Sequence, residues 1–157
     1  TGLINAVYNE SGITLIILDN STTGMTGHQD HPATGKNLKG EPAPAVLLDD
    51  ICRACGVKDI AIVDAYDVNA VEDAVKKAIA SKEVSVIIAQ RPCVLLDKRP
   101  KPVMTVDGCR KCGKCMKLGC PAISKSPEGV RIDPTQCTGC GVCAEVCPFG
   151  AIKEGVR

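Results

Sequence analysis

Apolar residues in the first two thirds of the chain form short runs that alternate with segments of helical spacing. Runs rich in β-branched residues predict strands at residues 13–18, 59–64 and 84–89. The first run is almost continuously apolar, which is typical of a strand buried on both faces of a parallel sheet. Because strands and helices alternate, we predict an α/β domain with a parallel, doubly wound sheet.

Helical spacing of apolar residues predicts three helices, at residues 1–10, 44–55 and 69–81. The second is expected to end at Gly56, and Asn69–Glu72 has the pattern of a capping box that would start the third. About three strands are few for a sheet of this kind, and the chain begins in the middle of the pattern. We therefore expect a piece of a longer polypeptide, with the domain truncated on its N-terminal side.

A charged, proline-rich stretch at residues 97–102 interrupts this pattern and is predicted to be a linker. It separates a first domain, residues 1–96, from a second, residues 103–157. In the second, short apolar runs predict an outer and an inner antiparallel pair: 103–106 with 152–156, and 123–125 with 130–132.

Eight of the 11 cysteines form two similar runs in the second domain. Each run has three cysteines spaced three residues apart, followed by a fourth that precedes a proline. Three thiolates at this spacing can bind three irons of a cubane cluster, while the fourth binds the other cluster. We therefore predict two [4Fe–4S] clusters. Their predicted ligands are Cys109, Cys112, Cys115 and Cys147 for the first, and Cys137, Cys140, Cys143 and Cys120 for the second.

This arrangement resembles the bacterial two-cluster ferredoxin module, which implies a small α+β ferredoxin-type domain. Zinc sites and disulfides are the alternatives, since paired cysteines also bind zinc and oxidised cysteines pair with each other. Triplets with a trailing Cys-Pro favour iron–sulfur clusters over paired zinc ligands. The first run departs from the common pattern, because four residues, 116–119, precede Cys120 where three are usual.

Composition and charge limit the classes of function that are compatible with this chain. The chain is 45% hydrophobic, and its net charge of +1 does not suggest a nucleic-acid-binding protein. No apolar run reaches the roughly 18 residues of a membrane helix, and no signal peptide is evident. We expect a cytoplasmic protein with reduced thiols.

The loop at residues 19–32 follows the first predicted strand, where open α/β sheets bind their ligands. The segment from Leu18 to Gln29 resembles the second half of the thiamine diphosphate motif. The resemblance implies that Mg2+ is bound by the Asn20 side chain and the Thr22 carbonyl, with Gly24 and Thr26 in the same cofactor loop. The partner aspartate would lie upstream of Thr1. A plain turn at a strand end would explain the same residues.

The longer string 25–32, Met-Thr-Gly-His-Gln-Asp-His-Pro, together with the ferredoxin-type domain, resembles the alpha subunit of indolepyruvate:ferredoxin oxidoreductases. The resemblance implies CoA-dependent oxidative decarboxylation of arylpyruvates, with a beta subunit as partner and ferredoxin as electron acceptor. Related pyruvate-type enzymes have glycine at the position of His28, which favours an arylpyruvate substrate. Two alternatives remain: another 2-oxo acid:ferredoxin oxidoreductase, or a non-catalytic two-cluster electron carrier with an α/β docking domain.

Further residues carry candidate chemistry. His28 and His31 are candidate catalytic groups for proton handling at the substrate carbonyl, or they order the loop by hydrogen bonds. Cys52 and Cys55 form a CxxC pair that is either redox-active or, as their place at a helix end favours, buried as small apolar residues. Cys93 is structural or of unknown role. The basic residues of the first cysteine run are either solvated surface or a docking face for an acidic ferredoxin: Arg110, Lys111, Lys114 and Lys117.

Overall fold

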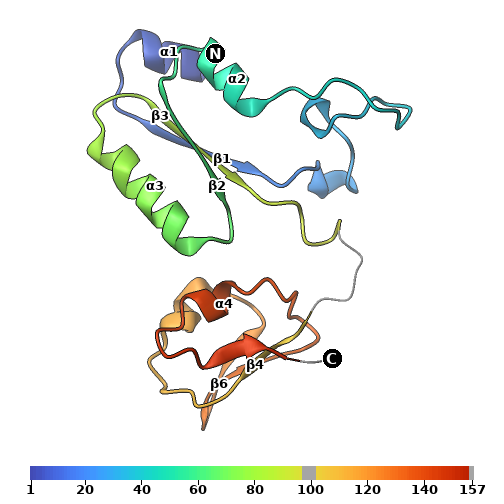
Figure 1. Ribbon diagram of the computed structural model, residues 1–157, viewed down its shortest axis with the longest axis vertical. Coiled ribbons are helices and arrows are strands. Elements are labelled where there is room, and N and C mark those ends of the chain that lie inside the picture. Colours follow the sequence, from blue (N-terminus) through green and yellow to red (C-terminus); the bar gives the residue numbers. More distant parts are fainter. Residues whose placement is uncertain (97–101, 156–157) are drawn as a thin grey trace. The chain divides into compact units, whose positions relative to one another are not determined.

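The computed structural model describes residues 1–96 and 102–155, without the side chain of Thr26. It forms two compact units, Thr1–Leu96 and Asp97–Arg157 (Figure 1). The predicted linker at 97–102 lies outside the described residues except for Pro102.

The first unit is built on a parallel sheet with the strand order β1-β3-β2. Its strands are β1 (Thr14–Asp19), β2 (Asp59–Asp64) and β3 (Ser85–Gln90). In the central strand, Val86, Ile87 and Ile88 are each at most 2% exposed. The strands therefore form where the sequence predicts them, and their carboxyl ends share one edge of the sheet.

The prediction that the first strand is buried on both faces is wrong. β1 is an edge strand, and on one of its faces Ile16 and Leu18 are 47% and 78% exposed. The opposite face of β1, with Leu15 and Ile17, packs in the core. An apolar run does not distinguish a central strand from an edge strand, because that depends on which strands are its neighbours.

Two short helices, α1 (Gly2–Tyr8) and α2 (Leu48–Ala54), pack on one face of the sheet. The longer α3 (Val68–Ala80) contacts β2 and β3 from the other side (Figure 1). Two short 3-10 helices, η1 (Gly24–Thr26) and η2 (Pro32–Thr34), lie in the loop after β1.

Two predicted helix starts need correction. The helix predicted from residue 44 begins at Leu48, and Ala45, inside the predicted range, is exposed. The third helix is capped by Asp67, whose carboxylate accepts a hydrogen bond from the Ala70 N–H at 2.8 Å. A carboxylate at this position satisfies an unpaired N–H of the first turn, so the helix starts before Asn69. The predicted end at Gly56 is confirmed by its left-handed φ of +93°.

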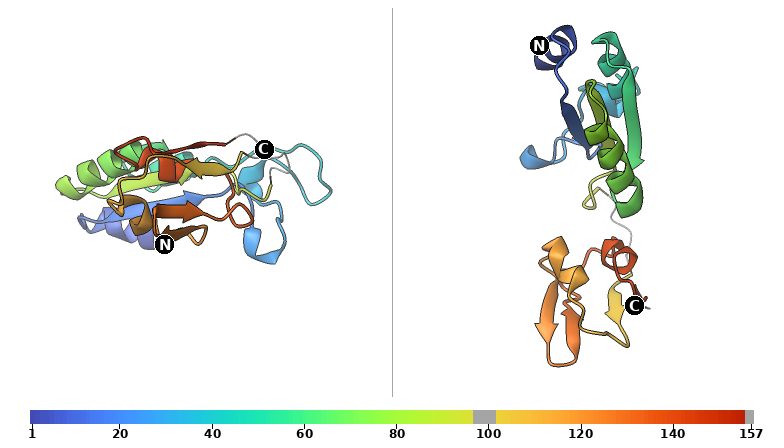
Figure 2. Two further views of the ribbon diagram at one scale, coloured as in Figure 1. Left: turned by 90° about the horizontal axis from the view of Figure 1, so that it is seen from below. Right: turned by 90° about the vertical axis from the view of Figure 1, so that its left-hand side faces the viewer.

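The second unit contains two antiparallel pairs, as predicted. β4 (Met104–Val106) pairs with β7 (Ile152–Glu154), and β5 (Ile123–Ser126) pairs with β6 (Gly129–Ile132) (Figure 2). Two short helical segments, η3 (Lys114–Leu118) and α4 (Val142–Glu145), carry the third cysteine of each run. The core is small and includes two of the thiols: Met104, Cys115, Ala122, Ile123, Ile132, Cys143 and Ile152.

No helix within residues 1–96 or 102–155 has the length and apolar character needed to cross a membrane.

Candidate cofactor sites

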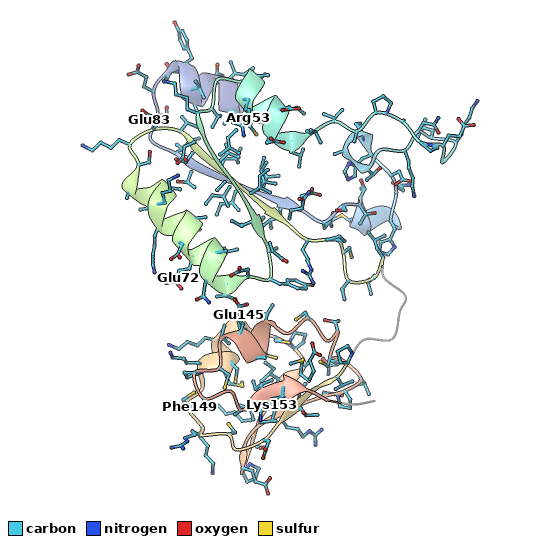
Figure 3. The ribbon with its side chains drawn as sticks, viewed as in Figure 1. Arg53, Glu72, Glu83, Glu145, Phe149 and Lys153 are labelled. Atoms are coloured by element: carbon cyan, nitrogen blue, oxygen red, sulfur yellow. The ribbon has the colours of Figure 1, made fainter. Side chains whose placement is uncertain are left out.

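The eight predicted cluster ligands line two separate cavities of the second unit. The first cavity is lined by Cys109, Cys112, Cys115 and Cys147. The second is lined by Cys120, Cys137, Cys140 and Cys143. The fourth cysteine of each run thus lies with the first three of the other run, which is the grouping that the spacing predicts. Yellow sulfur atoms of this unit are visible in Figure 3.

The two cavities differ in volume. The second has a volume of about 300 Å³, and the first has a volume of about 10 Å³. Of the four thiols around the first cavity, Cys112 is exposed.

The backbone around each set follows one plan. Gly113 precedes η3 with φ +73°, and Gly141 precedes α4 with φ +81°. Left-handed glycines at matched positions turn the chain two residues before the third cysteine, where a side chain would be strained. The resulting short helices place Cys115 and Cys143 inside the unit.

The additional residue before Cys120 is accommodated at Gly119. η3 ends at this glycine, which has a left-handed φ of +64°. In the second run, α4 ends at Val146 with a helical φ of −78°, and Cys147 follows immediately. The first run thus inserts one left-handed residue between its helix and its fourth cysteine.

A close approach of β6 helps to position Cys109. A Cβ atom on Gly129 would lie 2.6 Å from Sγ and 2.8 Å from Cβ of Cys109. Such distances are too short for any side chain, so Gly129 allows the strand to pass beside the predicted ligand. Sequence inspection missed this residue, because a glycine after a turn has no distinguishing pattern.

Burial and neighbouring thiols shape the pKa values of the predicted ligands. Burial first, and then Cys140 and Cys137, raise the pKa of Cys143 to about 11. Burial likewise raises the pKa of Cys115, with its neighbouring thiols adding to the effect. A buried thiolate needs a cation to compensate its charge, so iron binding at these sites would release protons.

Cys147 differs from these two buried thiols. Burial raises its pKa, but hydrogen bonds from backbone N–H groups, beginning with Phe149, outweigh burial and leave the pKa below its usual value. The Ala151 N–H, for example, donates to its Sγ at 3.4 Å. Backbone N–H groups that point at a sulfur stabilise a thiolate ligand. The chemistry of both sets therefore fits an iron–sulfur cluster.

Within the described residues, no three Cys, His, Asp or Glu side chains converge to hold one metal ion. A cubane does not require such convergence, because each thiolate binds a different iron.

The predicted thiamine loop begins where β1 ends. The Asn20 Oδ1 accepts a hydrogen bond from the Thr22 N–H at 3.2 Å, and its carbonyl accepts one from the Cys93 N–H at 2.8 Å. Thr22 is 7% exposed, and its hydroxyl donates to the Gln29 carbonyl at 3.4 Å. These contacts hold oxygen atoms of the kind that Mg2+ prefers, so the residues present fit a magnesium-diphosphate site.

The remaining predicted residues of this loop lie nearby in the chain. Gly24 begins η1, and a Cβ there would lie 3.7 Å from the Asn20 side chain, an ordinary contact. The Thr26 side chain lies outside the described part of the structure.

Residues at the ends of the other strands anchor the loop, and the sequence did not single them out. The Gln90 side chain donates to Asp19 at 2.7 Å, and the Arg91 N–H donates to the Asp19 carbonyl at 2.9 Å. The Arg91 guanidinium pairs with Asp64 at 2.6 Å and lies 4.7 Å from the Tyr66 ring centre. The only available signal was their position at the carboxyl ends of parallel strands.

The two histidines occupy different settings. His31 caps η2, because its Nδ1 accepts a hydrogen bond from the Ala33 N–H at 3.2 Å, while its own backbone N–H donates to Thr34 Oγ1 at 3.2 Å. This favours the loop-ordering alternative for His31. His28 is exposed and has a left-handed φ of +61°, which is uncommon for a residue with a side chain.

Comparison with known families identifies the type of domain that the first unit forms. The family model for the thiamine pyrophosphate enzyme, C-terminal TPP binding domain, matches residues 1–89. The chain belongs to the thiamine pyrophosphate enzyme family. A second family model, the 4Fe-4S binding domain, matches residues 130–153. The predicted fold class, a partial thiamine-binding α/β domain followed by a small α+β ferredoxin-type region, is confirmed.

Relatives match the chain along its length. Indolepyruvate oxidoreductase subunit IorA of Archaeoglobus fulgidus is 44% identical over 159 aligned positions, covering 96% of this chain and 26% of the relative. The subunit of the same name from Methanothermobacter marburgensis is 42% identical, covering 99% and 26%. Pyruvate synthase subunit PorD of that organism is 47% identical over 55 positions, covering 34% and 63%. The thiamine pyrophosphate enzyme chain is thus homologous to the C-terminal region of IorA and spans about a quarter of these IorA relatives.

Proposed function

We propose that the chain is part of an enzyme that oxidatively decarboxylates arylpyruvates such as indolepyruvate, with coenzyme A as acyl acceptor and ferredoxin as electron acceptor. One observation carries this proposal: a thiamine-domain loop and two sets of four thiols occur in one chain that is 44% identical to an indolepyruvate oxidoreductase subunit. The beta subunit of the same enzyme would be the partner, and the free thiols suit a reducing cytoplasm.

Thiamine diphosphate supplies a carbanion for decarboxylation, and iron–sulfur clusters carry the released electrons singly. The residues of the chain bind and orient these groups. Asn20 Oδ1 and the Thr22 carbonyl would bind Mg2+, while the anchored strand ends keep the loop in place. Cys109, Cys112, Cys115 and Cys147 would hold one cluster, and the other four thiols would hold the second.

The substrate class is supported by His28. Its left-handed backbone, φ +61°, is one that glycine adopts without strain, and pyruvate-type enzymes have glycine there. Retaining a side chain in a strained conformation is typical of residues with a functional role. We therefore propose that His28 contributes to arylpyruvate preference or to proton handling at the substrate.

The test is a substrate comparison in the complete enzyme. CoA-dependent dye reduction should be fastest with indolepyruvate and slower with pyruvate and 2-oxoglutarate. His28→Gly should lower the ratio of kcat/KM for indolepyruvate to that for pyruvate by roughly tenfold, a usual size for a pocket change. His31→Ala is the control, since loss of a cap should lower thermal stability and leave the ratio unchanged. A wild-type preference for pyruvate or 2-oxoglutarate would assign a different 2-oxo acid.

A further inference from the structure

The segment that carries the first three cysteines is strongly basic. Residues 109–119 contain four Lys or Arg and no Asp or Glu, whereas the matched residues 137–147 contain a single charged residue, Glu145. The four basic side chains are all exposed: Arg110, Lys111, Lys114 and Lys117. The two cysteine runs share one backbone plan but differ in the charge of their intervening residues.

One thiol of the first set also lies at the surface. Cys112 is exposed, whereas the four thiols of the second set are buried or partly buried. Phe149, which is 52% exposed, lines the same cavity as Cys112, and the Arg110 guanidinium lies 5.6 Å from its ring centre. Figure 3 labels Phe149 in this unit. Exposed aromatic residues and arginines are enriched in protein interfaces.

Two lysines of this segment are available to a partner. Lys111 is engaged within the unit, since its Nζ donates to the Pro127 carbonyl at 2.7 Å. Lys114 and Lys117 are three residues apart on η3, so they share one side of a helix with three residues per turn. The described residues show no ion pair or side-chain hydrogen bond for either.

We define the basic face as Arg110, Lys114, Lys117 and Phe149. We propose that the basic face docks an acidic one-electron carrier of the ferredoxin type. The carrier would take electrons from the cluster that the first thiol set would hold. Charge complementarity selects this occupant, because a basic surface steers and orients an acidic partner. The inference rests on the proposed function. A reduced cluster held by the first thiol set would give up one electron in each encounter, and the carrier's centre would gain it, with no proton or bond transferred.

The direct test is binding of a purified acidic bacterial 2[4Fe–4S] ferredoxin to the iron-loaded full chain, measured by calorimetry. The double variant Lys114→Glu/Lys117→Glu should raise Kd by roughly tenfold or more at low salt. At about 0.5 M salt the difference should nearly vanish, because charges are then screened within a few ångströms. Phe149→Ala should weaken binding at both salt concentrations, because its contact is not electrostatic.

The matched control is Lys125→Glu/Lys153→Glu, which changes net charge equally at exposed lysines of β5 and β7 that line neither thiol cavity. Its Kd should stay within about twofold of the wild-type value. Equal weakening by both double variants would overturn the proposal, since only net charge would then matter. An unchanged Kd for the first variant would also overturn it.

Iron and sulfide content of the same samples separates this proposal from the proposed function. A chain without iron contradicts the proposed function. An iron-loaded chain that binds the carrier without regard to Lys114 and Lys117 contradicts only the docking surface.

Discussion

The two halves of the second unit share one backbone plan and differ in what surrounds their thiols. Left-handed Gly113 and Gly141 lead into the short helices at matched positions. Around the first set, backbone N–H groups donate to the sulfurs of Cys109 and Cys147 at 3.4 Å. The described residues show no such bond from another residue to the second set. The two halves thus share their backbone geometry and differ in the hydrogen bonds to their sulfurs.

A second difference lies two residues after the first cysteine of each run. Gly139 has a left-handed φ of +67°, and the matched residue, Lys111, has a similar φ of +56°. Lys111 is held in this conformation by the bond from its N–H to Cys109 and by its Nζ bond to Pro127. At Lys111, a strained backbone conformation is thus retained because the residue forms compensating contacts.

The largest expected effect comes from removing one cysteine ligand at a time from each half. If ligation is crossed, Cys147→Ala should remove the same cluster as Cys109→Ala, and Cys120→Ala the same cluster as Cys137→Ala. Each variant should lose about half of its iron, because the three remaining thiolates cannot hold a cubane securely. Low-temperature EPR of the reduced protein identifies the surviving cluster. Matching spectra for Cys120→Ala and Cys109→Ala would instead mean uncrossed ligation.

A glycine substitution should affect the first half alone. Gly129→Ala would push a methyl group to within 2.6 Å of Cys109 Sγ, so we expect selective loss of the first cluster. Gly119→Ala is the control, because its Cβ would meet nothing within 4 Å. Only left-handed strain of about 1–2 kcal/mol is expected there. Iron content and thermal bleaching of visible absorbance distinguish the two variants. Full iron retention in Gly129→Ala would show that β6 can move aside.

The charge difference should separate the reduction potentials. Reduction adds negative charge, which nearby cations, N–H···S bonds and solvent exposure all stabilise. We expect the first cluster to have the higher potential, and Lys114→Gln/Lys117→Gln to lower it with little effect on the second. Redox titration followed by EPR measures both. Equal shifts of the two clusters would mean that the charges act on the unit as a whole.

The smallest expected effect is a pH dependence confined to the second half. Hydrogen bonds from Thr135, with its side chain first and its N–H next, hold the pKa of Asp133 below its usual range. The turn containing Asp133 leads to Cys137, whose N–H donates to the Asp133 carbonyl at 3.0 Å. Because the folded pKa is depressed, the stabilisation is complete above the unfolded pKa of about 3.9 and is lost as pH falls through the folded value.

Acid should therefore loosen the second cluster in a way that Asp133→Asn mimics at neutral pH. The measurement is the rate of iron release to a chelator as a function of pH, with EPR to assign the cluster. Glu128→Gln, at an exposed position in the β5–β6 turn, is the control. Identical acid profiles for Asp133→Asn and the wild type would contradict this role.

Local pattern predicted most of the elements. The hairpin pairs, the strand positions and α3 follow from periodicity, because each depends on neighbours close in sequence. The start of α2 was missed because residues 42–48 contain no polar side chain that marks a cap. The cap of α3 was missed because both Asp67 and Asn69 could serve. The role of His31 as a cap and the anchoring of Asp19 by Gln90 depend on loop and inter-strand geometry, which periodicity does not encode.

The sequence by itself determined the eight thiols, the metal chemistry that their spacing predicts, the thiamine-type loop and the basic character of the first run. Spacing suffices there because the ligands of each run are close along the chain. Tertiary structure decided how deeply each thiol is buried, which of them reaches the surface and why Gly129 must lack a side chain. It also made β1 an edge strand with an exposed face. These features depend on contacts between residues far apart in the chain, which only the packed fold brings together.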